Sequence, residues 1–363
     1  MEIGAYFSGV SDYRVVGRCL HLLSDILALV LCGTLADCDT FIEIADFGKD
    51  NEEFLKSELG FSFPNGIPSE DTLLRVFNHL KPSELQKSYQ LLLQDLSLAG
   101  KQIAIDGKEL PSTIGKGNKH SSLQLVNMWV DEWGLSFGQE RVEQKSNEIK
   151  AIPALVQNFD LRGSVVSIDA IGCQKEVVKE LRGQGADYVI ALKKNQKKLY
   201  EQVEAELNRQ KAALLSSQSW DLGHGRGELR RLYVCENIDF VDEKSAWQDL
   251  KSVILVERTR WIDDKEQAAK CLYISSLVDQ SPEKMASYIR NHWAIENRLH
   301  WQLDSTFGED NSLSRNENAL QNLHLMRKWA LFLFKKDPEK ISIKRKRKKA
   351  SRNKDYLNYL LTN

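Results

Sequence analysis

The stretch Gln102-Ile103-Ala104-Ile105-Asp106 marks the point where the hydrophobic pattern of the chain changes. Before it, apolar residues recur at the three- and four-residue spacing of helices, and after it short apolar or alternating runs indicate strands. Residues 123–130 and 135–143 are predicted to form the next two strands, joined by a short turn at 131–134. We therefore expect a sheet that begins at residue 102.

Helical and strand patterns alternate after these three strands. We predict, in chain order, a helix over 149–159, a strand over 164–169, a helix over 174–184, a strand over 187–192 and a helix over 196–210. Three sequential strands followed by this alternation are typical of a ribonuclease-H-like domain, an α/β fold with a mixed sheet and helices on both faces. We place this domain at residues 101–334.

Strand-like runs interrupt the alternation before the last long helix of the domain. They lie at 228–235, 252–257 and 271–274, and we interpret residues of about 215–280 as a β-rich insertion. Ser281-Pro282-Glu283 then supplies a helix N-cap, a proline at the first helical position and an early acid. We predict that the helix it opens runs to about Asp304.

Residues 1–100 are predicted to form an all-helical N-terminal domain. Apolar positions recur at helical spacing, and Ser69 is an expected N-cap before the two acids Glu70 and Asp71. This segment carries 7 basic and 15 acidic residues, so it is poorly suited to holding a duplex electrostatically. We interpret it as a scaffold that contacts protein or packs against the core.

The net charge of −1, from 50 basic and 51 acidic residues in a chain of 363, hides a strong segregation. Residues 335–354 hold 11 basic and 2 acidic side chains, and we interpret 335–363 as a basic C-terminal tail. A mobile tail of this kind would neutralise phosphates, with affinity that falls steeply with salt. The alternative is a solvated, partly helical terminus.

Membrane and secretory features are not expected. The apolar run at 26–36 is far shorter than the roughly 20 residues of a membrane span, so it reads as a buried helix. The N-terminus lacks a cationic segment leading into an apolar one, and the six cysteines form no C-x-x-C pair. We expect a cytoplasmic protein with reduced thiols, no membrane partner and no nucleotide cofactor.

Two aspartates each close an apolar run: Asp106 ends 103–106, and Asp169 ends 165–169. If the two strands are parallel neighbours, both carboxylates emerge at the edge where α/β sheets usually hold ligands. Aspartate also closes many strands simply because it favours turns, which is the alternative for either residue alone.

Glu296 is the third acid in an unusual position. On a helical wheel the apolar residues of the last helix fall on one arc, and Glu296 falls inside that arc. An unpaired ionised carboxylate is very costly to bury, so Glu296 is expected to need a cation or a proton. A structural pair with His292, one turn earlier on the same face, is the alternative.

Together, Asp106, Asp169 and Glu296 are hard oxygen ligands of the kind that Mg²⁺ or Mn²⁺ prefers. Such a cluster could hold two cations roughly 3.5–4 Å apart, the arrangement that activates an attacking oxygen and stabilises a leaving one in phosphoryl transfer. Cleavage or joining of nucleic acid is the chemistry that this predicts.

Two other hydrolase signatures do not fit. Residues 134–138 match the G-x-S-x-G nucleophile elbow, but Ser136 lies in a predicted strand rather than between a strand and a helix. The seven histidines show no H-E-x-x-H spacing, which disfavours a zinc hydrolase.

Seven motifs, in order, resemble the DDE transposases of bacterial insertion sequences, and within them the H-repeat-associated group. They are Gly66–Thr72 with 75–77, Ile105–Lys108, Lys145–Ile149 with 152–153, Ile168–Gln174, Asp187–Lys193 with 195–196, His224–Arg226 with Glu228 and Arg230, and Arg290–Asn297 with 299–301. The resemblance covers nearly the whole chain.

The resemblance implies that Asp106, Asp169 and Glu296 bind two divalent ions, Mg²⁺ or Mn²⁺. These ions would serve first to hydrolyse the phosphodiester at an element's end and then to direct the freed 3′-hydroxyl against target DNA. The implied partners are double-stranded DNA, as terminal inverted repeats and as target, and a second copy of the chain in the DNA complex. A decayed or domesticated copy that binds DNA or protein without catalysis is the alternative.

The wider superfamily grips DNA with an arginine four residues before the glutamate and a lysine seven after it, where this chain has His292 and Leu303. Arg290, Arg298 or Lys193 is expected to take over this role. For Trp301 we weigh base stacking against packing on the β-rich insertion. The full set of expected DNA-binding residues is Lys108, Lys145, Lys193, Asn195, His224, Arg226, Arg290, His292, Asn297, Arg298 and Trp301.

Overall fold

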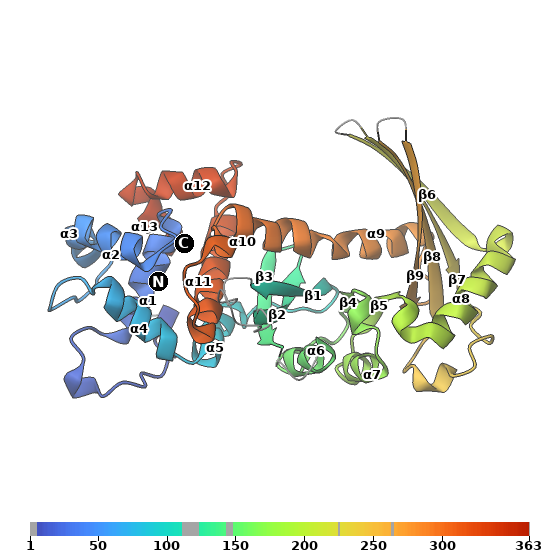
Figure 1. Ribbon diagram of the computed structural model, residues 1–363, viewed down its shortest axis with the longest axis horizontal. Coiled ribbons are helices and arrows are strands. Elements are labelled where there is room, and N and C mark those ends of the chain that lie inside the picture. The colour runs from blue at the N-terminus through green and yellow to red at the C-terminus, as the bar shows by residue number, and fades with distance from the viewer. Residues whose placement is uncertain (1–5, 111–122, 143–147, 224–225, 263–264, 363) are drawn as a thin grey trace, which may run out of the picture.

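A nine-stranded mixed sheet runs through the centre of the chain in the computed structural model (Figure 1). The structure describes residues 6–110, 123–142, 148–223, 226–262 and 265–362. The strand order is β3-β2-β1-β4-β5-β9-β8-β7-β6. The strands are β1 (Gln102–Leu110), β2 (Leu123–Val130), β3 (Leu135–Arg141), β4 (Val165–Ile168), β5 (Asp187–Leu192), β6 (Leu215–Gly223), β7 (Arg226–Cys235), β8 (Ser252–Ile262) and β9 (Lys265–Ser275).

The first five strands have the ribonuclease-H-like arrangement that the sequence predicts. β1, β2 and β3 form an antiparallel meander, and β4 and β5 run parallel to β1. Helices α6 (Glu148–Val156) and α7 (Lys175–Gly183) lie below the sheet in Figure 1, and α9 (Pro282–His292) crosses above it. Helices therefore cover both faces of a mixed sheet.

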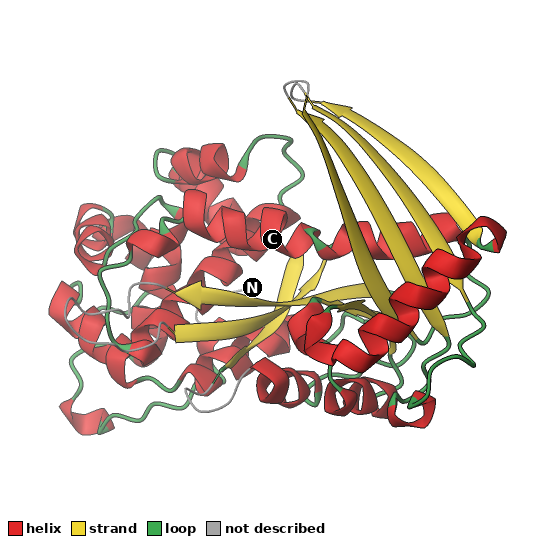
Figure 2. Ribbon diagram, turned by 45° about the vertical axis from the view of Figure 1, so that its right-hand side comes forward, coloured by secondary structure: helices red, strands yellow, loops and turns green. Residues whose placement is uncertain are grey.

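The predicted β-rich segment continues this same sheet. β9 pairs antiparallel with β5, and β6–β9 form a curved blade against which α8 (Lys197–Gln210) packs (Figure 2). β8 and β9 are longer than predicted, and β6 was not predicted. Its residues, mostly polar, show no apolar alternation, because β6 is an edge strand that is held by its hydrogen bonds to β7.

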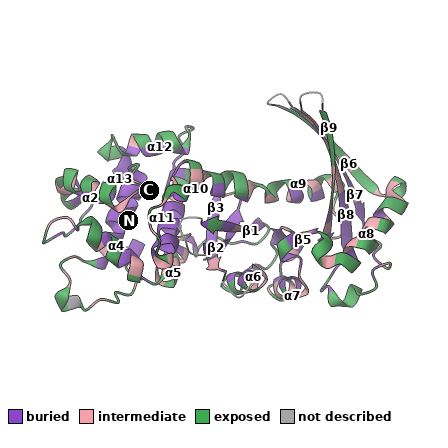
Figure 3. Cartoon of the chain, in the orientation of Figure 1, coloured by how far each residue is buried: buried purple, intermediate pink, exposed green. Residues whose placement is uncertain are grey.

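The N-terminal residues form the expected helices. These are α1 (Leu23–Leu35), α2 (Phe41–Asp50), α3 (Glu52–Ser57), α4 (Glu70–His79) and α5 (Pro82–Leu93). Ser69 caps α4 by accepting a hydrogen bond from the Thr72 amide, as predicted. The long helix α11 (Glu317–Lys336) packs against α1, α4 and α5, so the chain returns to this helical unit after the sheet (Figure 3).

The basic C-terminal segment is folded, so the expectation of a mobile tail is wrong. Residues beyond α11 form α12 (Ile343–Ala350) and α13 (Lys354–Thr362). Lys346 is 3% exposed and Arg347 1%, although both belong to the most basic run of the chain. The Lys346 ammonium donates to the backbone oxygens of Phe334 and Asp337 at 2.8 and 2.7 Å. The buried positions of α12 have helical spacing, a pattern that the density of lysine and arginine conceals.

Within the described ranges, no helix combines the length and the apolar character that a membrane span requires.

Candidate active site

Asp106 and Asp169 lie side by side on neighbouring parallel strands, as the sequence predicts. Ile105 of β1 pairs with Ile168 of β4, so the two aspartates follow at the same level of the sheet. One detail of the prediction is wrong, because Asp106 does not end its strand. β1 continues to Leu110, since β2 pairs with it along its whole length.

Hydrogen bonds and close packing fix the conformation of the turn that follows Asp169. The Asp169 carboxylate accepts a hydrogen bond from the Ile171 amide at 3.1 Å. A Cβ atom on Gly172 would lie 2.3 Å from the Ile168 side chain, so the turn requires glycine. The Asn195 amide group donates to the Ala170 carbonyl at 2.7 Å. Asn195, expected to bind DNA, thus has its amide engaged in holding the loop that presents Asp169.

Glu296 begins an irregular part of the last helix. α9 ends at His292, residues Glu296–His300 form a π-helical turn (η8), and α10 (Trp301–Ser305) follows. Leu299 and Leu303 are fully buried, as the wheel predicts, but Glu296 is exposed, so its predicted burial is wrong. The wheel assumed one regular helix at 100° per residue, whereas the helical hydrogen bonding is interrupted at Trp293, and Glu296 then begins a π-turn.

Glu296 and Asp169 influence each other electrostatically. Partial burial raises the pKa of Glu296, and the negative charge of Asp169 raises that pKa further. The alternative of a Glu296–His292 pair is wrong, because His292 Nδ1 instead lies 3.3 Å from Ser167 Oγ. Burial lowers the pKa of His292, so the ring next to β4 is neutral at neutral pH. The helix glutamate and the strand aspartate thus form an anionic site.

Two buried residues lie next to Asp106. His300 Nδ1 is 3.6 Å from the Asp106 carboxylate, and burial lowers the pKa of His300 to about 3. Lys108 is 7% exposed, and its ammonium lies 2.5 Å from the Asp304 carboxylate. Side chains alternate along a strand, so Asp106 and Lys108 face the same way, toward the last helix. Lys108, expected to bind DNA, is thus largely buried and already paired with Asp304.

A buried polar cluster lies behind Lys108, and the sequence reading missed it. Glu309 is 2% exposed and lies 2.9 Å from His324 Nδ1 and 3.3 Å from Arg327 Nη1. Lys328 donates to Asn127 Oδ1 at 3.2 Å, and burial lowers the pKa of Lys328 to about 7. The sequence feature that could have revealed this cluster is the set of polar residues inside the long apolar pattern of α11.

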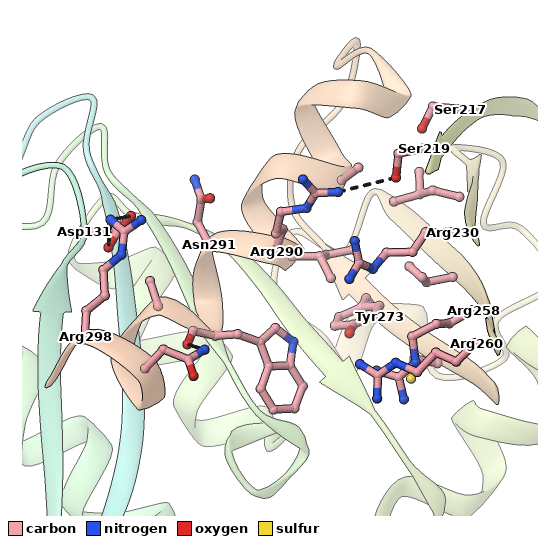
Figure 4. A pocket seen from close by; sticks show the side chains of 18 residues that line it. Asp131, Ser217, Ser219, Arg230, Arg258, Arg260, Tyr273, Arg290, Asn291 and Arg298 are labelled. Atoms are coloured by element: carbon pink, nitrogen blue, oxygen red, sulfur yellow. Dashed lines mark hydrogen bonds and ion pairs between the residues drawn. The ribbon is translucent and has the colours of Figure 1, made fainter. Parts of the chain in front are cut away.

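A basic groove of about 750 Å³ separates the last helix from the blade (Figure 4). We call it the arginine groove. Its wall on the blade carries Arg230, Arg258 and Arg260, and its wall on the helix carries Arg290 and Arg298. Asn297 and Trp293 also line it, beside Glu296.

Several of these arginines have acidic partners. Arg290 lies 3.3 Å from Asp221, and Arg298 lies 3.0 Å from Asp131. Arg258, by contrast, forms no ion pair within the described part of the chain, and it is partly exposed in the groove. The sequence reading selected Arg290, Asn297 and Arg298 but not Arg258, since a lone arginine in a strand carries no signal of its own.

The remaining predicted residues are dispersed. Lys193 is exposed directly after β5, one strand away from Asp169. Trp301 is 58% exposed, so the alternative in which it packs on the blade is wrong. Arg226 begins β7. Lys145 and His224 lie outside the described residues.

The donor set suits a hard divalent cation, although the site is not preassembled. Among the described residues, no group of three or more aspartate, glutamate, histidine or cysteine side chains could hold a metal ion as it stands. Asp106 and Asp169 are nevertheless strand neighbours, and the charge of Asp169 reaches Glu296. Carboxylates that repel one another would be drawn together by a cation, so these residues fit Mg²⁺ or Mn²⁺.

Comparison with known proteins gives two family matches that together cover most of the chain. Residues 5–91 match the DDE_Tnp_1-associated family, and residues 98–333 match the transposase DDE domain. The chain is 36% identical to the putative transposase YncI of Escherichia coli O157:H7, over 98% of this chain and 93% of the relative. It is 33% identical to the H repeat-associated putative transposase YhhI of Escherichia coli K12, over 97% and 95%.

Among solved structures, the chain resembles the piggyBac transposase in its synaptic complex with hairpin DNA. The TM-score is 0.43 and the identity 13%, with 99% of this chain and 78% of that chain covered.

Proposed function

The chain belongs to the DDE-domain transposase family, and from this premise we propose that it cleaves DNA at the ends of a mobile element and joins the freed 3′ ends to target DNA. We propose that Asp106, Asp169 and Glu296 hold two Mg²⁺ or Mn²⁺ ions for this reaction. The observation that carries the proposal is that Asp106 and Asp169 lie at the same level of neighbouring parallel strands, while Glu296 feels the charge of Asp169 and lies between residues that line the arginine groove.

The protein's own residues prepare this site before any ion binds. The turn held by Gly172 and Asn195 presents the Asp169 carboxylate, and the adjacent strand presents Asp106. When bound, divalent ions supply activation of the attacking oxygen and stabilisation of the leaving one. The buried, neutral His300 beside Asp106 excludes bulk water from one side of that carboxylate.

The arginine groove is the proposed path of the DNA backbone. It runs from the blade to residues 293, 294, 297 and 298, which lie on either side of Glu296 in the sequence. Phosphate oxygens match guanidinium groups in charge and geometry, and arginine–phosphate contacts release condensed counterions. The folded C-terminal segment retains exposed basic side chains at Lys344, Arg345 and Lys348.

Cleavage of a defined DNA tests the proposal. Purified full-length protein is incubated with Mg²⁺ or Mn²⁺ and a labelled duplex that carries the terminal repeats flanking the gene. Nicking at the repeat boundary that disappears with EDTA is the expected result. Specific binding of the repeats without cleavage would support the decayed-copy alternative. Neither binding nor cleavage would contradict the proposed function altogether.

We expect Arg258→Gln to weaken end binding and to reduce the slope of log K against log salt by about 1, the contribution of one phosphate contact. Arg231→Gln is the matched control, because Arg231 lies on the adjacent strand but outside the groove. Titrations by fluorescence anisotropy at several salt concentrations measure both slopes. Equal slopes for the two variants would remove Arg258 from the DNA path.

A further inference from the structure

Three residues of the last helix, spaced in multiples of four, contact polar side chains on β1 or β4. His292 Nδ1 lies 3.3 Å from Ser167 Oγ, His300 Nδ1 lies 3.6 Å from the Asp106 carboxylate, and Asp304 lies 2.5 Å from Lys108. The last helix therefore lies along β1 in a defined alignment. Glu296 lies between two of these contacts, those of His292 and His300.

A regular α-helix could not keep this register. At 3.6 residues per turn, positions four apart turn by about 40° at each step, so four such positions would spread over about 120°. The regular α-helical hydrogen-bonding pattern is interrupted at Trp293, and residues Glu296–His300 then form the π-turn, which holds more residues per turn. The π-turn lies between Glu296 and His300, so its larger number of residues per turn offsets the rotation at that step.

Among these contacts between the last helix and the strands, the one made by Lys108 is the most firmly held. Its side chain is 6% exposed and lies between Asp304, at 2.5 Å, and Glu309, at 3.6 Å. Glu309 is itself fixed by His324 and Arg327 from α11. Because Lys108 is two residues from Asp106, and Asp304 is eight residues from Glu296, this ion pair ties the strand of one proposed ligand to the helix of another.

We propose that the Lys108–Asp304 ion pair is a positioning device that fixes the last helix against β1 and thereby sets where Glu296 lies relative to Asp106 and Asp169. Lys108 does not touch DNA in this role, and Asp304 does not bind metal. The inference rests on the proposed function, since it concerns the geometry of the same three acids.

The test uses Lys108→Met, Asp304→Asn and the double variant in the full chain. Lys101→Met is the matched control, because Lys101 immediately precedes β1 and pairs with Glu132 of the β2–β3 turn instead of the helix. We measure Mn²⁺ binding by electron paramagnetic resonance, end binding by anisotropy, the cleavage rate with saturating end DNA, and the melting temperature. Asp304→Glu and Lys108→Arg retain the charges and serve as conservative variants.

We expect each single variant to weaken Mn²⁺ binding about 10- to 100-fold, as loss of an outer-shell partner does, and to slow cleavage about 100-fold. End binding should stay within about twofold of wild type, the double variant should be no worse than either single one, and the conservative variants should recover most of the rate. Asp304→Asn is the variant most certain to fold, since the Asp304 side chain is 31% exposed.

Mn²⁺ affinity and cleavage equal to those of Lys101→Met would overturn the inference. A loss confined to end binding would overturn it too, because it would make Lys108 a phosphate contact. If wild-type protein binds Mn²⁺ but never cleaves, the proposed function fails, while the Mn²⁺ titrations of the variants still decide the positioning role.

Discussion

Asp169→Asn should lower the rate of metal-dependent cleavage about 1,000-fold or more, with end binding close to wild type. The substitution removes a negative charge from the acid that most directly influences Glu296. It preserves the shape of the side chain, and its amide oxygen can still accept the hydrogen bond from Ile171. The fold should therefore survive while the affinity for divalent ions falls.

Single-turnover cleavage of end DNA at saturating protein measures this rate, and thermal melting confirms that the variant is folded. Asp160→Asn is the matched control, because Asp160 pairs with Arg162 in an exposed loop after α6. Cleavage by Asp169→Asn at the wild-type rate would exclude Asp169 from the reaction. Inactivity of the wild-type protein on its own ends would instead favour the decayed-copy alternative.

Arg347→Ala should lower the free energy of unfolding by about 3 kcal/mol, because it removes a buried guanidinium and leaves the backbone carbonyls to which it donates without that donor. The Arg347 guanidinium lies 2.8 Å from Asp39, donates to the Thr306 and Thr34 carbonyls, and packs on the Phe307 ring at 4.6 Å. It therefore connects α12 to the N-terminal helices and to the end of α10.

Urea unfolding followed by circular dichroism gives this free energy. Arg345→Ala is the matched control, since Arg345 is an exposed residue of the same basic run. That variant should change stability by less than about 0.5 kcal/mol. Equal, small effects of the two substitutions would indicate a mobile basic tail that does not pack against the rest of the protein. A large effect of Arg347→Ala alone would show that the positive charge at the C-terminus serves stability as well as solvation.

Some of this protein could be predicted from short stretches of sequence, because local patterns cause the local structure. The change from helical to alternating periodicity at residue 102 reflects which faces of each element are buried, so it correctly indicated the first five strands in their order along the chain. Asp106 and Asp169 could be found for the same reason, since each follows an apolar run in neighbouring parallel strands.

The errors arose where distant segments determine the local structure. β6 lacks apolar alternation and exists because β7 pairs with it. Glu296 is exposed where the wheel expected burial, because the last helix is not one regular helix: its hydrogen bonding is interrupted at Trp293 and continues as a π-turn from Glu296. Lys108 looks like a surface cation beside the acids, yet Asp304, almost two hundred residues later, buries and neutralises it.

The sequence by itself thus determined the family and most of the order of elements, and it singled out the three acids that we propose as metal ligands, since these depend on periodicity and on motifs within single elements. Only the tertiary structure decided which cations remain available to DNA. Three cations are buried and paired within the chain, namely Lys108, Lys346 and Arg347. Arg258 and its neighbours, in contrast, line the open arginine groove. Composition counts charges, but desolvation and ion pairing, which depend on three-dimensional neighbours, determine which of those charges a partner can reach.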